Sequence, residues 1–533
     1  MTRLLFSLLI LSWPATVVGQ APSVVADGQT LEGTALTDRS GMSVFRGVRY
    51  AMAPVGDLRW RPPVPHPAGS GTRAAKDFSP SCAQTDRLSV WTRSIAQVFG
   101  TVDKVEAEPL VISEDCLYLN VWTGNLARRS AAQPVMVWIH GGSNLNGQGS
   151  SLWYDGANLA AKGVVVVTIN YRLGVFGFMA HPALTAESPN RASGNYGLLD
   201  QLEALRWVKR NIAAFGGDPN RVTVFGESAG SINVIHLMAS PQSKGLFHRA
   251  IAQSGVPMAA MAPLKMAEMA GAGVAKMLNA DPSNVLQSLR AASTQEVLAA
   301  GTRAIASGQL MGPIVDGWLL PDMTVRLFEA GKQLAVPLLV GSNALEMSTL
   351  RTYLPRFEQT PAGYQKWVGQ TFAAAAPKVL ELFPVASADD LEPKFLEVVT
   401  DLLFGCPTRI AVRAMAARSS PVYLYQFTRV LPGGEKLGAY HAMEIPYAFG
   451  NRLAWMPREA TDERLSATMM EYWTRFAATG NPNGGREMKW PAYSPESDQS
   501  LELGSTLRVV TGLKKSVCDV IEPVMRAGWA TAM

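Results

Sequence analysis

Charged residues, histidine and cysteine are all scarce in this sequence. Only 17% of the 533 residues are charged, and the 48 basic and 43 acidic side chains are interspersed without a basic run. The net charge of +5 therefore forms no concentrated patch, and no nucleic-acid partner is expected. Because 47% of the residues are hydrophobic, the chain can build a large globular core.

Long apolar runs are also missing after residue 19, so no bilayer-spanning segment or membrane anchor is expected. Residues 1–19 have the three parts of a secretory signal peptide. Arg3 supplies a positive start, Leu4–Leu11 a short apolar core, and Val17-Val18-Gly19 a small-residue cleavage site. We therefore expect an exported, soluble protein, periplasmic or extracellular, in which residues 20–533 form a single domain.

Cysteine occurs only four times, at Cys82, Cys116, Cys406 and Cys518. An even count is typical of disulfides in an exported protein. Pairing Cys82 with Cys116 and Cys406 with Cys518 is one of three possible arrangements, and buried free thiols are the alternative. The spacing matches no zinc-binding pattern, and we expect neither a metal nor a cofactor.

The strongest catalytic signal is a strand, turn and helix around residue 228. Val222–Phe225 is a run of β-favouring residues, Gly226-Glu-Ser-Ala-Gly230 turns the chain, and residues 232–238 have helix-compatible apolar spacing. Gly-x-Ser-x-Gly in this context is the nucleophile elbow, a strained turn that exposes the serine hydroxyl. The sequence therefore predicts Ser228 as a nucleophile.

Alternating strands and helices predict the fold class. Continuous apolar runs at 134–140, 163–170, 336–340 and 422–427 indicate buried strands, and residues 197–212 are amphipathic at helical spacing. This pattern predicts an α/β fold with a large, mostly parallel central sheet wrapped by helices.

The scarcity of histidine makes the catalytic base easy to select. A serine nucleophile needs a base, which follows the serine and the acid in the chain order of this architecture. Of six histidines, only His236, His248 and His441 follow Ser228. The first two lie along or just after the predicted elbow helix, and neither is in a loop that could return over Ser228. His441 is the predicted base.

The base needs an orienting carboxylate, for which Glu346 is the predicted residue. It follows the apolar strand 336–340, where a loop at the carboxyl edge of the sheet faces the elbow. Asp316 and Asp401 are the competing candidates, but Asp316 lies in a tight Asp-Gly turn and Asp401 in a helix-like run.

Backbone amides are expected to stabilise the tetrahedral oxyanion that forms when the serine attacks. One is the amide of Ala229, directly after the nucleophile. The others are the amides of Gly142 and Ser143, in the loop after strand 134–140.

Several longer motifs lie along the chain, at Ser113–Asn120, Asn170–Gly174, Gly194–Gln201, Phe215–Pro219, Gly226–Gly230 and His441–Phe449. They resemble motifs of the type-B carboxylesterase/cholinesterase family, in a bacterial-type secreted form. The similarity extends from about residue 24 to the C-terminal region. The resemblance implies an α/β-hydrolase fold and hydrolysis of small-molecule esters through an acyl-enzyme, with a triad of Ser228, Glu346 and His441.

The resemblance also implies specific residue pairs that the spacing alone leaves open. They are two disulfides, Cys82 with Cys116 and Cys406 with Cys518, and two ion pairs, Arg59 with Glu114 and Arg172 with Asp218.

The chain departs from the family pattern at three places. The usual His-Gly-Gly-Gly-Phe is His140-Gly-Gly-Ser-Asn144, so Ser143 replaces the third glycine; the other two changes are Leu345-Glu-Met347 and His441-Ala-Met-Glu444. Two other functions use the same fold: a non-catalytic binding or adhesion module, and an amide or carbamate hydrolase with the same triad. Retention of both Ser228 and His441 favours the ester hydrolase over the binding module.

Overall fold

The computed structural model describes residues 21–39, 41–124, 126, 132–309, 311–418 and 420–530. The predicted signal peptide at 1–19 lies outside these residues. Within them, no helix is both long and apolar enough to cross a membrane.

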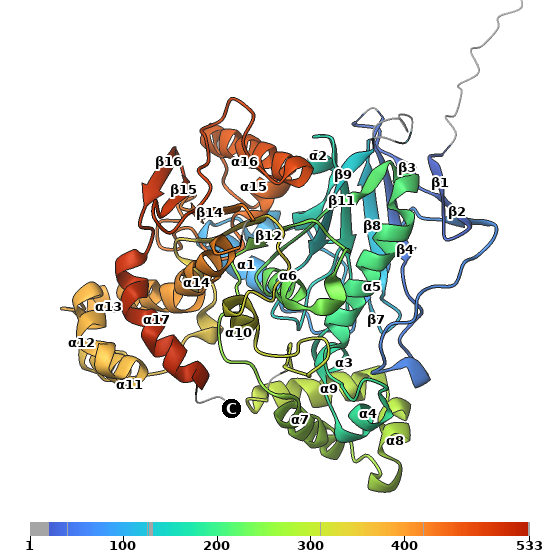
Figure 1. The fold of residues 1–533 in the computed structure, drawn as a ribbon, viewed down its shortest axis with the longest axis horizontal. Helices are drawn as coiled ribbons and strands as arrows, with labels where there is room; N and C mark the ends of the chain where they lie inside the picture. Colours follow the sequence, from blue (N-terminus) through green and yellow to red (C-terminus); the bar gives the residue numbers. More distant parts are fainter. Residues whose placement is uncertain are drawn as a thin grey trace, which may run out of the picture.

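A large twisted sheet forms the centre of the molecule (Figure 1). In the described residues it has 11 strands, in the order β16-β15-β14-β13-β12-β11-β9-β10-β8-β4-β3. The block from β15 to β10 is parallel, and antiparallel strands flank it at both edges. The strands are β3 (Thr34–Ala35), β4 (Ser43–Arg49), β8 (Tyr118–Thr123), β9 (Gln133–Ile139), β10 (Val165–Ile169), β11 (Gly217–Glu227), β12 (Arg249–Gln253), β13 (Leu338–Asn343), β14 (Val422–Phe427), β15 (Gln499–Leu503) and β16 (Leu507–Thr511).

Short strands outside this sheet belong to the N-terminal part of the chain. They are β1 (Ser23–Ala26), β2 (Gln29–Glu32), β5 (Thr72–Ala74), β6 (Ser81–Cys82) and β7 (Ile112–Ser113).

Helices cover both faces of the sheet and form two outer groups, α7 to α9 at the bottom of Figure 1 and α11 to α13 at the left. The helices besides these six are α1 (Leu88–Val98), α2 (Ala157–Ala160), α3 (Gly174–Phe178), α4 (Pro182–Glu187), α5 (Tyr196–Asn211), α6 (Ala229–Ala239), α10 (Thr324–Glu329), α14 (Cys406–Ala416), α15 (Ile445–Phe449), α16 (Ala460–Thr479) and α17 (Lys515–Ala530). The outer groups are α7 (Leu264–Met277), α8 (Val285–Ala291) and α9 (Thr294–Ala306), and α11 (Pro361–Phe372), α12 (Ala376–Leu382) and α13 (Ala388–Thr400).

The two-residue period of the strands divides the core into two layers. Val135, Val137 and Ile139 of β9 pack in one apolar cluster with residues of α5 and α6. Met136 and Trp138 of the same strand pack in a second cluster with residues of α15 and α16. Because both faces are covered, a central strand such as β9 carries apolar residues on both faces, and each fully buried Val, Leu, Ile, Phe or Met side chain stabilises the fold by about 1.5–3 kcal/mol. The predicted α/β fold is confirmed.

The parallel strands all end at one edge of the sheet, and four of them lead into loops with predicted site residues. Ser228 follows β11, and the Gly142–Ser143 loop follows β9. Glu346 follows β13, and His441 lies in the loop after β14. The topology therefore gathers residues that are up to 299 positions apart in sequence, from Gly142 to His441.

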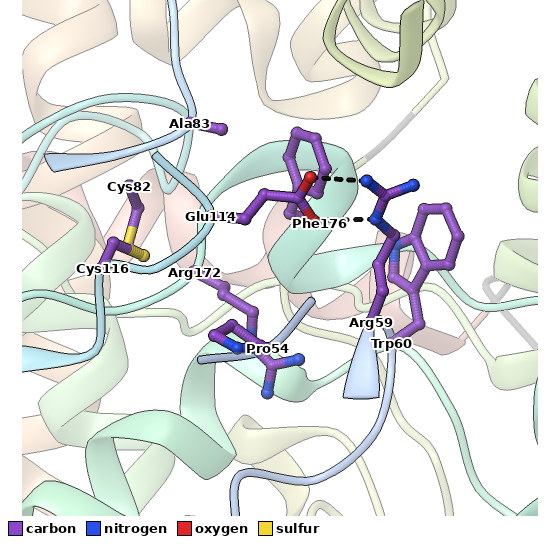
Figure 2. A pocket seen from close by; sticks show the side chains of 9 residues that line it. All are labelled: Pro54, Arg59, Trp60, Cys82, Ala83, Glu114, Cys116, Arg172 and Phe176. Atoms are coloured by element: carbon purple, nitrogen blue, oxygen red, sulfur yellow. Dashed lines mark hydrogen bonds and ion pairs between the residues drawn. A yellow bond between two sulfur atoms is a disulfide. The ribbon is translucent and has the colours of Figure 1, made fainter. Parts of the chain in front are cut away.

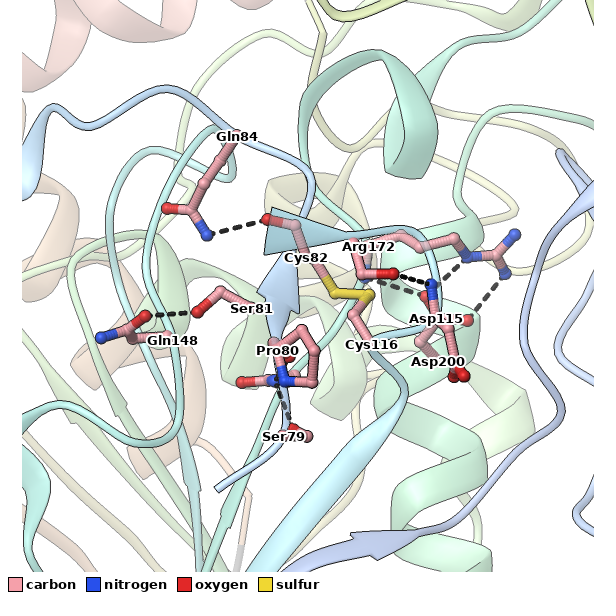
Figure 3. Close-up of a disulfide and its surroundings, with 12 residues drawn as sticks. Ser79, Pro80, Ser81, Cys82, Gln84, Asp115, Cys116, Gln148, Arg172 and Asp200 are labelled. Carbon is pink, nitrogen blue, oxygen red and sulfur yellow. Dashed lines mark hydrogen bonds and ion pairs between the residues drawn. A yellow bond between two sulfur atoms is a disulfide. The ribbon is translucent and has the colours of Figure 1, made fainter. Parts of the chain in front are cut away.

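Both disulfides join segments that are distant in sequence. The bonded pairs are Cys82 with Cys116, shown in Figure 3, and Cys406 with Cys518. The first ties β6 to the segment before β8. The second joins the start of α14 to α17.

One implied ion pair is present. Arg59 Nε lies 2.8 Å from Glu114 Oε2, and both side chains are buried (Figure 2). The pair lines a small cavity beside the Cys82–Cys116 disulfide, with Trp60 and Phe176. The guanidinium group lies 5.5 Å from the ring centre of Trp60, so an ion pair and an aromatic contact together hold Arg59 in place.

The second implied ion pair is wrong. Arg172 pairs with Asp200 of α5, with Nη2 and Oδ1 2.7 Å apart (Figure 3), and Asp218 instead pairs with Arg221 at 2.8 Å. Arg172 follows the carboxyl end of β10, whereas Asp218 lies at the amino end of β11. In a parallel sheet these ends are at opposite edges, so the pair cannot form.

Candidate active site

The elbow holds Ser228 in a strained backbone conformation. Ser228 has φ 55° and ψ −123°, between the end of β11 and the start of α6. A β-carbon added to Gly230 would lie 1.9 Å from the Ile139 carbonyl oxygen, and one added to Gly226 2.6 Å from the carbonyl carbon of Gly230. The glycines therefore allow α6 to begin against the end of β9, which forces the sharp turn at Ser228.

His441 is buried and contacts the predicted acid. Its Nδ1 lies 2.7 Å from Glu346 Oε2. Glu346 is itself fully buried, and its other oxygen accepts a hydrogen bond of 2.6 Å from the Asn343 amide. The carboxylate is thus anchored to the end of β13 and fixes the orientation of the imidazole.

Sequence reasoning missed Glu227, whose carboxylate faces the other nitrogen of the imidazole. Glu227 Oε1 lies 3.1 Å from His441 Nε2, and the side chain is 3% exposed. Since Glu227 directly precedes Ser228, this contact brings His441 to the elbow. The motif itself could have indicated Glu227, because an ionisable residue directly before the serine of Gly-x-Ser-x-Gly lies in the turn, next to the nucleophile.

A third buried carboxylate, Glu444, lies in the same cluster. It accepts hydrogen bonds from Asn343 Nδ2 at 2.6 Å and from Gln253 Nε2 at 3.2 Å. Burial and the neighbouring Glu346 carboxylate raise the pKa of Glu444 to about 7. Burial also raises the pKa of Glu227 well above its ordinary range.

The carboxylates make the imidazole strongly basic. Burial by itself lowers the pKa of His441, but the negative charges of Glu227, Glu346 and Glu444 outweigh burial and raise the pKa to about 9. The cluster therefore favours the imidazolium, the form that a catalytic base reaches after taking a proton from serine.

The loop after β9 lies against the elbow. A β-carbon on Gly141 would lie 3.1 Å from Ser228 Cβ. Gly142, Ser143 and Asn144 have φ values of 100°, 59° and 57°, so the loop passes through three successive left-handed residues. In the part of the chain that the structure describes, neither the Gly142 nor the Ser143 amide donates a hydrogen bond to another residue. Both amides are thus available to a ligand oxygen.

The remaining candidates have partners outside this cluster. His236 Nδ1 lies 2.7 Å from Thr324 Oγ1, and His248 Nδ1 accepts from the Val222 amide at the amino end of the sheet. Asp316 accepts three backbone amides in its own turn, from Trp318 to Leu320, and Asp401 pairs with Lys514 at 2.9 Å.

A π-helix at Asp401–Gly405 supplies one wall of the site. It places the ring centre of Phe404 5.3 Å from that of His441. Among the described residues, no group of three His, Cys, Asp or Glu side chains could hold a metal ion. What the arrangement offers is a serine on a strained turn, a basic imidazole and unpaired amides.

Comparison with known proteins identifies the family. The model of the carboxylesterase family matches residues 20–521. Fumonisin B1 esterase from Sphingopyxis macrogoltabida is 36% identical over 491 residues, covering 90% of this chain and 87% of that protein. Para-nitrobenzyl esterase from Bacillus subtilis (strain 168) is 35% identical over 490 residues, covering 89% of this chain and 93% of that protein.

Solved structures agree with the sequence comparison. A thermophilic PNB esterase has a TM-score of 0.80 and 33% identity, covering 94% of this chain and 100% of that one. A PNB esterase structure also has a TM-score of 0.80, at 31% identity, covering 94% of this chain and 99% of that one. The chain belongs to the carboxylesterase family and is a carboxylic-ester hydrolase with the α/β-hydrolase fold.

Proposed function

We propose that this protein is an exported serine esterase that hydrolyses small-molecule esters through an acyl-enzyme on Ser228. The observation that carries the proposal is the position of His441. Its Nδ1 contacts Glu346, and its Nε2 faces Glu227, the elbow residue directly before Ser228. The proposed catalytic residues are Ser228, His441 and Glu346.

In the first half-reaction, Ser228 Oγ attacks the ester carbonyl carbon while its proton passes to His441 Nε2. Glu346 accepts the Nδ1 hydrogen, so that in the neutral imidazole Nε2 carries the lone pair and acts as base. The tetrahedral intermediate collapses when the imidazolium gives its proton to the leaving alcohol. Water then attacks the acyl-enzyme in the same way, and the carboxylic acid leaves.

The oxyanion is proposed to lie between the amides of Ala229, Gly142 and Ser143. The Ala229 amide is at the N-terminus of α6, where the unpaired amides and the helix dipole favour a negative charge. Each such donor contributes a rate factor on the order of 10²–10³ because it strengthens as charge develops on oxygen.

Export is proposed from the signal-peptide pattern at residues 1–19. The two disulfides support it, since such bonds persist in oxidising compartments.

Replacing the nucleophile tests the proposal most simply. We expect Ser228→Ala to lower kcat on p-nitrophenyl acetate by a factor on the order of 10⁵–10⁶, with an unchanged thermal midpoint. Ser240→Ala, at the far end of α6, is the matched control and should keep wild-type turnover. Turnover by Ser228→Ala above about a tenth of wild type would exclude Ser228 as the nucleophile.

The acid is tested by a pair of amide substitutions. Glu346→Gln should lower kcat by a factor on the order of 10³–10⁴ with KM nearly unchanged, because the imidazole loses its orienting charge. Asp316→Asn, which alters a carboxylate bound to its own turn, is the control. If Asp316→Asn proved as damaging and Glu346→Gln harmless, the acid would have been assigned wrongly.

Glu227 is tested by the pH profile of kcat/KM. Activity needs the neutral imidazole, so it rises with pH as His441 loses its proton. A carboxylate beside Nε2 raises the pKa of His441, and its removal in Glu227→Gln should move the acidic limb to lower pH. Glu203→Gln, at a buried glutamate of α5, should leave the limb in place. A limb that stays fixed or moves to higher pH in Glu227→Gln contradicts this account.

A further inference from the structure

A hydrogen bond between two exposed side chains links Ser143, next to the elbow, with Tyr353. Ser143 Oγ and Tyr353 Oη lie 2.7 Å apart, and the residues are 210 positions apart in sequence. Both side chains are exposed, with Tyr353 at 52%. The bond joins the loop after β9 to the segment that follows Glu346.

Ser143 occupies a backbone conformation that disfavours a side chain. Its φ of 59° is in the left-handed region, which glycine adopts freely and other residues adopt at a cost. The chain therefore needs a compensating contact to keep the Ser143 amide in place.

The neighbouring residues have their own compensation. Asn144, also left-handed, accepts a 2.8 Å hydrogen bond from Asn233 Nδ2, and its carbonyl accepts one of 2.7 Å from the Gly174 amide. On the other side, the Gly142 carbonyl accepts from the Leu145 amide at 2.9 Å. The Ser143 side chain has Tyr353 as its partner.

Tyr353 is presented by a well-anchored segment. It ends the short helix Arg351–Tyr353, seven residues after Glu346. The Thr349 carbonyl accepts from Trp91 Nε1 at 3.0 Å, and Ser348 Oγ donates to the Leu437 carbonyl at 2.7 Å. The tyrosine hydroxyl thus reaches Ser143 from a segment that begins at Glu346 and that the bonds of Ser348 and Thr349 hold in place.

We propose that Tyr353 is a positioning residue for the oxyanion hole: its hydroxyl offsets the strain of Ser143 and holds the Ser143 amide toward the substrate carbonyl. The inference rests on the proposed role of that amide. Tyr353 therefore affects the reaction step, in which the amide acts, and does not affect the initial binding of the ester.

Substitutions that separate the hydroxyls from the backbone strain test this. Tyr353→Phe removes the hydroxyl but keeps the ring, and should lower kcat on p-nitrophenyl acetate about tenfold, less than full loss of a donor, with KM within about twofold. Ser143→Ala keeps the strain and loses the bond, so it should match Tyr353→Phe. Tyr472→Phe, which removes a hydrogen bond to the Met488 carbonyl, is the control and should keep wild-type kcat.

The decisive comparison uses Ser143→Gly as a background. Glycine has no hydroxyl for Tyr353 to bond and adopts the left-handed conformation without strain, so adding Tyr353→Phe to Ser143→Gly should change kcat by less than about twofold. The inference is overturned if Tyr353→Phe has the same effect in both backgrounds, or changes kcat by less than about twofold in the wild type. Either result, with Ser228→Ala inactive, leaves the proposed function intact; an active Ser228→Ala would instead remove the proposed function.

Discussion

The close approach of α6 to the end of β9 is the constraint on which the site depends. Gly230 allows the first turn of α6 to contact the Ile139 carbonyl, and Gly141 brings the next loop against Ser228. A larger residue at either position would separate the elbow from the loop of unpaired amides. The strained φ of Ser228 is a consequence of this packing, and burial of the parallel strands on both faces maintains it.

A second constraint is electrostatic. Three buried carboxylates, Glu227, Glu346 and Glu444, surround one imidazole and favour its protonated form. Such a cluster in an apolar interior is unfavourable without hydrogen bonds, which Asn343 supplies to Glu346 and Glu444 and Gln253 supplies to Glu444. Glu346 and Glu444, which these amides stabilise, set the basicity of His441 together with Glu227.

Local patterns in the sequence were enough to predict the sheet, the flanking helices and the elbow, because strand and helix periodicities are local properties. Elimination among the histidines after Ser228 selected His441, a position after a buried strand selected Glu346, and their side chains lie 2.7 Å apart. The partner of Arg172 was predicted wrongly, because an ion pair requires both residues to lie at the same edge of the sheet. The contacts of Glu227 with His441 and of Tyr353 with Ser143 join distant segments; the motif places Glu227 in the turn, but the sequence does not show what either residue contacts.

The central claim is that ester hydrolysis passes through a covalent intermediate on Ser228. The most direct measurement is the intact mass of the protein after treatment with p-nitrophenyl diethyl phosphate, followed by peptide mapping. The account predicts one diethylphosphoryl group per chain, located on Ser228, with loss of activity in proportion to labelling. Full inactivation with the label on another residue, or full labelling of Ser228 with activity retained, would contradict it.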